Sequence, residues 1–210
     1  NRLGISLITA KGAGCCGAAS HHTSGHDESL DFARRNIDAW WPHVEQGIEA
    51  IVMTASGCGV HVKDYGHLLR GDAAYASGAK RIAELTRDLS EIVVKEDLSK
   101  LKGAALQGIK IAVHTPCTLQ HGQKLNGVVE KILRGCGFEL VPVAESHLCC
   151  GSAGTYSILQ RDLSQQLLRR KLGHLEASAP AQIVTANIGC QTHLQSGTAI
   201  PVRHWVEVIG

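Results

Sequence analysis

The sequence lacks the features that mark several large classes of protein. Across 210 residues the formal net charge is only +2, and no basic run or aromatic-rich basic stripe indicates nucleic-acid binding. No apolar stretch approaches the ~20 residues that a membrane-spanning helix needs. We therefore expect no nucleic-acid partner and no membrane span.

Motifs for substrate turnover and for secretion are missing as well. There is no glycine-rich dinucleotide fingerprint, phosphate loop, nucleophile elbow or paired-carboxylate motif, so we expect no catalytic residue in this chain. The N-terminus carries neither an initiator methionine nor a basic segment followed by an apolar core. We expect a cytoplasmic location and a chain that begins inside a longer protein.

What the chain does contain is cysteine in a repeated pattern. Two adjacent pairs, Cys15-Cys16 and Cys149-Cys150, each precede a glycine. Each is followed about forty residues later by a Gly-Cys-x-x-His element, which holds Cys58 and His61 or Cys190 and His193. Cys117 precedes the second copy, and only Cys136 of the eight cysteines lies outside the pattern, as a small buried side chain. Such pairs favour metal ligation in a reducing compartment over disulfides.

The pattern also indicates a duplication. The Cys-Cys-Gly elements lie 134 residues apart and the Gly-Cys elements 132 apart. We expect two related lobes at 1–100 and 101–210, joined at 96–108. The first lobe is expected to be truncated at its N-terminus, because the counterpart of the strand before Cys117, and of Cys117 itself, would precede residue 1.

The predicted fold class is α/β, with a small, mostly parallel sheet flanked by helices in each lobe. Short, β-branched-rich segments without clean alternation predict buried parallel strands, at 5–9, 50–54, 109–114, 139–143 and 182–186. Helical patterns lie between them, at 27–47, 59–70, 72–95, 119–135, 154–176 and 191–197. This alternation favours βαβ units with right-handed crossovers.

In such a sheet, ligands collect at the carboxyl ends of the strands. Each cysteine of the second copy follows an expected strand, so we expect a common centre at that rim, held by Cys117, Cys149, Cys150 and Cys190 with His193 as a fifth ligand. Four sulfur donors suit an iron–sulfur cluster or zinc, and a thiol or disulfide role without metal is the third alternative. The first lobe offers Cys15, Cys16, Cys58 and His61, either as a metal site or as a vestigial one.

Other histidines are weaker candidates. His114, His121 and His147 flank the second site and are interpreted as hydrogen-bond donors around it. His21, His22 and His26 precede a helix and are interpreted as polar capping residues, with metal ligation as the alternative.

Five longer runs carry a resemblance to a known family. They are residues 36–42 (NIDAWWP), 54–59 (TASGCG), 116–121 (PCTLQH), 146–156 (SHLCCGSAGTY) and 185–194 (TANIGCQTHL). Together they resemble the duplicated cysteine-rich CCG domains of heterodisulfide reductase-type proteins, and within these the C-terminal region of glycolate oxidase (glycolate dehydrogenase) iron–sulfur subunits. The resemblance covers essentially the whole chain.

The resemblance implies a bacterial complex whose flavin subunits, which carry the FAD, oxidise glycolate to glyoxylate. The chain would hold a cluster, of the 4Fe-4S type, and pass electrons toward membrane quinones, with peripheral association at the inner face of the cytoplasmic membrane. A ferredoxin-like N-terminal region of the same subunit would be a further partner. This chain would not be catalytic alone.

One departure from the family pattern affects the ligand set. Heterodisulfide reductase-type domains end in Cys-x-x-Cys, whereas both copies here have Cys-x-x-His. The five-cysteine noncubane cluster is therefore not carried over, and a four-cysteine site, a Cys/His site or zinc stays open. The rival functions are a zinc-binding or metal-free docking module for the flavin subunits, or a thiol-based oxidoreductase acting through Cys149-Cys150.

Overall fold

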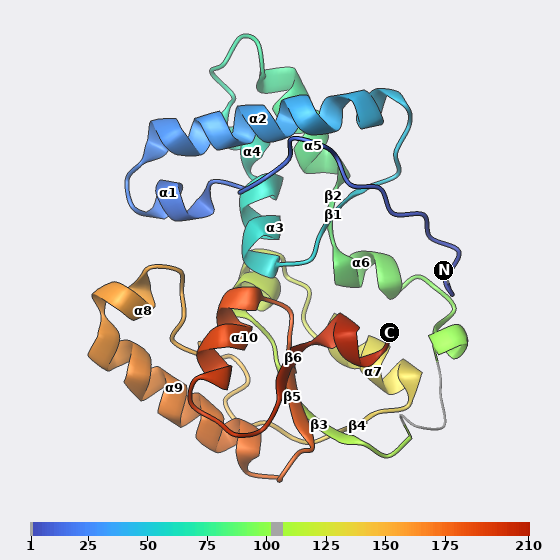
Figure 1. Cartoon of the computed structure of the whole chain (residues 1–210), viewed down its shortest axis with the longest axis vertical. Helices are drawn as coiled ribbons and strands as arrows, with labels where there is room; N and C mark the ends of the chain where they lie inside the picture. The colour runs from blue at the N-terminus through green and yellow to red at the C-terminus, as the bar shows by residue number, and fades with distance from the viewer. Residues whose placement is uncertain (1, 102–106) are drawn as a thin grey trace. The chain divides into compact units, whose positions relative to one another are not determined.

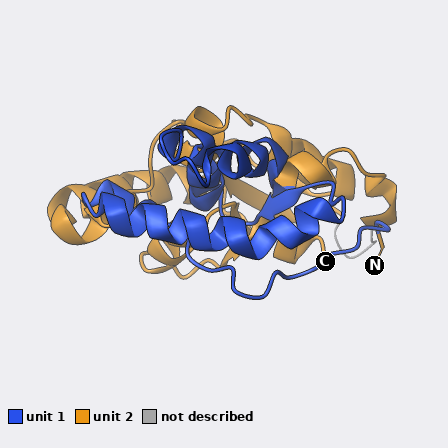
Figure 2. Cartoon of the chain, turned by 90° about the horizontal axis from the view of Figure 1, so that it is seen from above, with its two compact units in different colours: residues 1, 3–89 blue, residues 2, 90–210 orange. Residues whose placement is uncertain are grey.

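The computed structural model describes residues 2–101 and 107–210 (Figure 1). It divides into two compact units, drawn in different colours in Figure 2. Unit 1 is Leu3–Leu89, and unit 2 is Arg2 with the described part of Ser90–Gly210. The lobe boundaries at 1–100 and 101–210 stay a prediction, and the predicted joint at 96–108 includes residues 102–106, which lie outside the described residues.

Unit 1 is built on two short parallel strands. β1 (Ile51–Met53) pairs with β2 (Thr86–Asp88). Before β1 come α1 (Ala18–His22) and α2 (His26–Glu45), and between the strands come α3 (Ser56–Lys63), α4 (Tyr65–Leu68) and α5 (Ala76–Leu85). Val62, Tyr65 and Ile82 are fully buried in its core.

Unit 2 contains a four-stranded parallel sheet in the order β4-β3-β5-β6. The strands are β3 (Lys110–His114), β4 (Glu139–Leu140), β5 (Gln182–Thr185) and β6 (Val202–His204). The helices α9 (Arg161–Glu176) and α10 (Ile188–Gln195) pack on one side of the sheet, and α7 (Val128–Cys136) lies on the other (Figure 1). The short elements are α6 (Leu89–Val93), η1 (Leu98–Leu101), the π-helical turn η3 (Thr118–Gly122), α8 (Tyr156–Leu159) and η4 (Trp205–Val208).

The long helices α2 and α9 bury equivalent stripes. α2 buries Ser29, Ala33, Asn36 and Ile37, and α9 buries Ser164, Leu168, Lys171, Leu172 and Leu175. Both sets follow the i, i+4, i+7, i+8 spacing of one helix face. Each stripe carries a serine at its start and a second polar residue seven positions later, which is unusual for a core-facing surface.

The α/β class with small parallel sheets is confirmed, but several elements differ from the expectation, including the helix expected over 119–135, which is split into η3 and α7. Residues 5–9 form no strand, and Leu7 and Ile8 are exposed. The helix expected over 72–95 is interrupted by β2, and β6 was not expected. Both missed strands have a charged residue at their centre and lie at a sheet edge, where an apolar run is not required.

Candidate metal centres

The topology of unit 2 creates a natural ligand site between β3 and β5. From β3 the chain runs to β4 on one side and then returns to β5 on the other side of β3. The carboxyl ends of these two strands are adjacent, with His114 paired to Thr185. Open parallel sheets bind ligands at such a switch point. Cys117 follows β3, and Cys190 lies in the first turn of α10 after β5.

The four predicted thiols of unit 2 converge at this point. The Cys117 thiol donates a hydrogen bond to Cys149. The Cys150 thiol lies in hydrogen-bonding contact with both Cys149 and Cys190. Cys150 and Cys190 are buried, whereas Cys117 and Cys149 are half-exposed. Residues separated by up to 73 positions in the chain therefore form one continuous sulfur cluster.

His114 belongs to the same cluster. One of its ring nitrogens and the Sγ atoms of Cys150 and Cys190 all lie within 4.8 Å of one another. The residue is 1% exposed. Within the described part of the chain its ring nitrogens make no hydrogen bond of good geometry, but His114 contacts the Cys190 thiol closely enough to lower the pKa of that group. Burying an imidazole with so weak a partner is costly, so His114 is a candidate nitrogen ligand as well as the hydrogen-bond donor expected from the sequence.

The thiols influence one another's ionisation. Contacts with the Cys117 and Cys150 thiols lower the pKa of Cys149 strongly. Contact with the Cys150 thiol lowers the pKa of Cys190 to about 6, and the adjacent His114 acts in the same direction. Contact with Cys149 and burial raise the pKa of Cys117. These contacts favour the thiolate form, which binds metal, at Cys149 and Cys190.

His193 is placed beside the Cys-Cys-Gly turn. Its Nε2 lies 3.2 Å from Ser164 Oγ, and the same hydroxyl donates a 2.8 Å hydrogen bond to the Gly151 carbonyl. The Gly151 amide in turn donates to Cys149 Sγ at 3.3 Å. One nitrogen of His193 is therefore engaged with protein, and its role as a fifth ligand stays a prediction.

Lys171 anchors the segment that leads into Cys149. It is fully buried on α9, and its ammonium donates hydrogen bonds to the carbonyls of Glu145 (2.9 Å) and Ser146 (3.1 Å). Burial lowers its pKa, although the nearby thiols and Glu145 oppose the shift. A buried cation near the three sulfurs of Cys149, Cys150 and Cys190 offsets the negative charge of thiolates.

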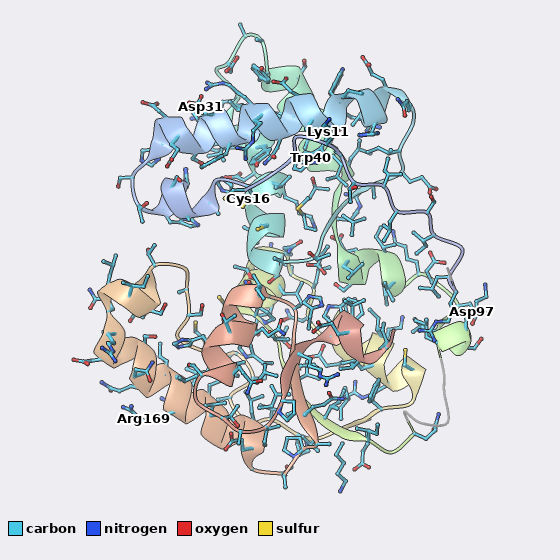
Figure 3. All side chains as sticks on the ribbon, viewed as in Figure 1. Lys11, Cys16, Asp31, Trp40, Asp97 and Arg169 are labelled. Carbon is cyan, nitrogen blue, oxygen red and sulfur yellow. The ribbon has the colours of Figure 1, made fainter. Side chains whose placement is uncertain are left out.

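In unit 1, the three predicted cysteines lie near one another but make fewer mutual contacts than the cysteines of unit 2. Cys16 lies where the chain enters α1 (Figure 3). Its thiol is in hydrogen-bonding contact with that of Cys58 in α3. That contact lowers the pKa of Cys58 to about 7. Cys15 is exposed, and its Sγ accepts a 3.5 Å hydrogen bond from the Gly17 amide, as Cys149 does from Gly151.

Buried polar side chains hold the unit 1 cysteines in place. Asn36 Nδ2 donates to the Cys15 carbonyl (2.9 Å), and Asn36 Oδ1 accepts from the Gly14 amide (2.9 Å). The Tyr65 hydroxyl donates to the Cys16 carbonyl (2.7 Å). These bonds fix the backbone of the cysteine pair on the buried stripe of α2.

His61 contacts Ser29 and the histidines of α1. Its Nε2 lies 3.3 Å from Ser29 Oγ, and burial lowers its pKa to about 4, with His21 and His22 adding to the effect. Ser29–His61 in unit 1 therefore matches Ser164–His193 in unit 2. Its assignment to the thiol site stays a prediction.

The sequence did not predict four polar residues that support the two sites: Ser29, Asn36, Ser164 and Lys171. A signal for them exists in the duplication, because Ser29 and Ser164 follow the two Cys-Cys-Gly elements at nearly the same distance. Each also begins an otherwise apolar helical stripe. Cys136 is fully buried, which confirms its interpretation as a core side chain. None of the eight cysteines, all of which lie in the described residues, forms a disulfide bond.

Comparison with known proteins identifies the family. The model of the cysteine-rich CCG domain matches residues 1–63 and 111–195. The chain is 54% identical over its whole length to the glycolate oxidase iron–sulfur subunit of Escherichia coli K12, and spans about half of that relative (51%). It is 31% identical, over 99% of its length and 87% of the relative, to lactate utilization protein A of Geobacillus sp. WCH70. The protein of that name from Geobacillus kaustophilus is 29% identical with the same coverage. The chain belongs to the family of cysteine-rich CCG domains.

Proposed function

We propose that this chain is the electron-transfer region of an iron–sulfur subunit in a flavin-dependent complex that oxidises glycolate to glyoxylate. The observation that carries the proposal is the convergence of Cys117, Cys149, Cys150 and Cys190 with the buried His114. The E. coli relative named as a glycolate oxidase iron–sulfur subunit supports the substrate class.

The residues fit an iron–sulfur centre. Thiolate sulfur is the usual ligand of such clusters, and imidazole replaces it in some of them. Cys117, Cys149, Cys150 and Cys190 are the proposed ligands of a 4Fe-4S cluster, with His114 or His193 available as a nitrogen ligand. An iron–sulfur cluster supplies one-electron chemistry when bound.

The residues around the thiols determine how the protein would tune a bound cluster. Buried Cys150 and Cys190 exclude water from one side of the site, while half-exposed Cys117 and Cys149 leave the other side accessible to an electron donor or acceptor. The Gly151 amide points at Cys149 Sγ, and Lys171 places positive charge nearby. Hydrogen bonds and charge at the sulfurs are the main means by which a protein tunes such a centre.

Partners and location follow from the same proposal. FAD would reside on separate flavin subunits, so glycolate oxidation would not occur on this chain, and a ferredoxin-like region would complete the electron path. None of the helices in 2–101 and 107–210 has the length and apolarity to cross a membrane. We place the complex in the cytoplasm, peripherally associated with the membrane.

Anaerobic metal analysis tests the centre. Wild-type chain reconstituted with iron and sulfide should be brown and contain both elements. Cys150→Ser should lose this content, because Cys150 contacts two other thiols of the cluster. Cys136→Ser is the matched control, since Cys136 is also fully buried. Equal iron in both variants would contradict the assignment. Stoichiometric zinc would favour the docking module, and metal-free protein with redox-active thiols a thiol oxidoreductase.

The nitrogen ligand can be identified separately. His114→Ala should change the electron paramagnetic resonance spectrum of the reduced centre, whereas His121→Ala, an exposed control, should not. If His193→Ala produces the larger change, His193 is the ligand and His114 only a neighbour.

The cysteines of unit 1 form the second part of the proposal. We assign Cys15, Cys16 and Cys58 to a second and incomplete metal site related to the first by duplication, with His61 as its nitrogen ligand only where the histidine binds no other metal ion. Cys58→Ser should therefore leave the iron of the unit 2 centre unchanged. Loss of all iron in this variant would show that the two sets of cysteines depend on each other.

A further inference from the structure

Four histidines gather in unit 1 from three different helices. His21 and His22 end α1, His26 begins α2, and His61 lies in α3. The ring centroid of His21 lies 5.6 Å from that of His22, 5.1 Å from that of His26 and 5.3 Å from that of His61. The His22 and His61 centroids are 6.4 Å apart. His21 is thus at the centre of an imidazole cluster.

These separations approach those of imidazoles on one metal ion. The ring nitrogens of His21, His22 and His61 do not all lie within 4.8 Å of one another, so binding one ion requires the rings to rotate. A zinc–nitrogen bond of ~2.0–2.1 Å and a ring radius of ~1.1 Å put the metal ~3.2 Å from each centroid, and tetrahedral geometry then separates two centroids by ~5.2 Å. The His21–His61 and His21–His22 distances are close to this value. The 6.4 Å between His22 and His61 requires a small rotation of His22, which is exposed and can rotate.

The backbone holds the histidines in this arrangement. The turn between α1 and α2 is closed by hydrogen bonds from the Gly25 amide to the Ser20 carbonyl (2.8 Å) and from the Ser24 amide to the His21 carbonyl (3.3 Å). The Thr23 hydroxyl adds a bond to the Ala19 carbonyl (2.9 Å). His21 and His26 therefore face each other across a rigid turn.

His61 has the environment of a metal-ligating histidine. It is 5% exposed, and its Nε2 is paired with Ser29 Oγ, which leaves Nδ1 for a ligand. Histidines that bind metal usually engage the second ring nitrogen with a protein group in this way. The groups acting on His61 are His21, His22 and Asp64, whereas Cys16 and Cys58 act on each other. Tyr65 contacts both groups, because its ring centroid lies 5.7 Å from that of His61 and its hydroxyl donates to the Cys16 carbonyl.

We propose that His21, His22 and His61 form a binding site for a divalent transition metal ion such as Zn²⁺, distinct from the thiol sites. His26 packs against His21 and orients it. Three imidazoles leave the fourth position of a tetrahedral ion to water. Neutral imidazole suits zinc and its neighbours in the first transition row. This inference does not depend on the proposed electron-transfer function.

Metal titration of the full chain tests the site. Zn²⁺ is the probe for stoichiometry, and Co²⁺ reports the ligand type through its visible spectrum. His21→Ala combined with His22→Ala should remove one equivalent of bound Zn²⁺ and a Co²⁺ band set without thiolate-to-metal charge transfer. His67→Ala, an exposed histidine of the same unit, should retain that equivalent. Circular dichroism checks that each variant is folded.

Two results would overturn the proposal. One is an unchanged number of Zn²⁺ equivalents in the double variant. The other is loss of a thiolate charge-transfer band instead, which would mean that the imidazoles complete the cysteine site. The single variant His22→Ala changes only an exposed side chain, and it should weaken Zn²⁺ binding at this site by at least about tenfold, since outer-shell changes alone cost about that much.

Discussion

Ser164 and His193 connect the two halves of the unit 2 motif. The serine lies on α9, its hydroxyl donates to the Gly151 carbonyl at 2.8 Å, and it meets Nε2 of His193 on α10 at 3.2 Å. The Cys-Cys-Gly turn and the Cys-x-x-His helix are therefore fixed to each other through one hydroxyl group. Ser29 and His61 repeat the relationship at 3.3 Å in unit 1, which supports the duplication at the level of side-chain contacts.

Ser164→Ala should destabilise the protein and loosen the cysteine turn. Ser164 is fully buried, so the substitution leaves the Gly151 carbonyl and His193 without this partner. Such a loss costs ~1–3 kcal/mol of unfolding free energy, measurable by urea denaturation. Ser157→Ala, which removes only an exposed bond to the Gly154 carbonyl, should cost much less. Equal effects of the two substitutions would show that the Ser164 contacts are unimportant.

Gly151 should be much less tolerant of a side chain than Gly154. Both have positive φ, +95° and +61°, so alanine at either position costs ~1–2 kcal/mol through backbone strain. A Cβ on Gly151 would also collide with the Ser164 carbonyl oxygen, whereas nothing lies within 4 Å of one on Gly154. Overpacking adds ~1–3 kcal/mol. Gly151→Ala should therefore unfold at clearly lower urea concentration and retain less iron than Gly154→Ala. Indistinguishable midpoints would refute the crowding argument.

The sequence predicted the sheet and the convergence of thiols because both depend on local patterns. Cys117 and Cys190 each follow a buried parallel strand, and parallel strands end at one rim. The strands β2 and β6 escaped prediction because each has an arginine at its centre and is stabilised by its neighbour in the sheet rather than by an apolar pattern. The apolar segment at 5–9 is the converse case. Its composition predicts a strand, but the segment forms none, and Leu7 and Ile8 are exposed.

The hydrogen-bonding partners of the site could not be predicted in the same way. Ser164 is 29 residues from His193, and their contact depends on how α9 and α10 pack together. His114 was noticed only as a flanking residue, because nothing in the sequence shows that its ring nitrogens make no hydrogen bond of good geometry. Tertiary packing decides which polar residues of an amphipathic helix turn inward.

Lys171→Met should destabilise the segment at 145–146 that leads into Cys149. The methionine side chain fits a buried position, but the Glu145 and Ser146 carbonyls lose the ammonium that bonds to them. We expect a loss of ~1–3 kcal/mol in unfolding free energy and a shift in the reduction potential of the reconstituted centre. The control is Lys110→Met, because Lys110 makes only an exposed ion pair with Glu139, worth ~0–1 kcal/mol. A more stable Lys171→Met variant with an unchanged potential would show that the cation has no role at the site.

Glu145 should make stability depend on pH in the acid range. It lies four residues before Cys149, and its carboxylate pairs with Arg170 and with His174 Nε2 (2.8 Å), both on α9. The hydrogen bond from Arg170, with that from His174, lowers the pKa of Glu145 from 4.5 to about 2. In the unfolded chain the carboxyl group binds its proton at the ordinary pKa, so the unfolded state gains the proton first as the pH falls.

The stabilisation from Glu145 should therefore be complete above the ordinary pKa of 4.5 and be lost as the pH falls to about 2. Glu145→Gln removes this titration. The difference in urea midpoint between wild type and Glu145→Gln should shrink as the pH falls from 4.5 to 2. Glu139→Gln reports what an exposed carboxylate contributes in the same assay. A wild-type advantage that grows on acidification would have the wrong sign, and would show that the Arg170 pair does not hold the Glu145 carboxylate in its charged form.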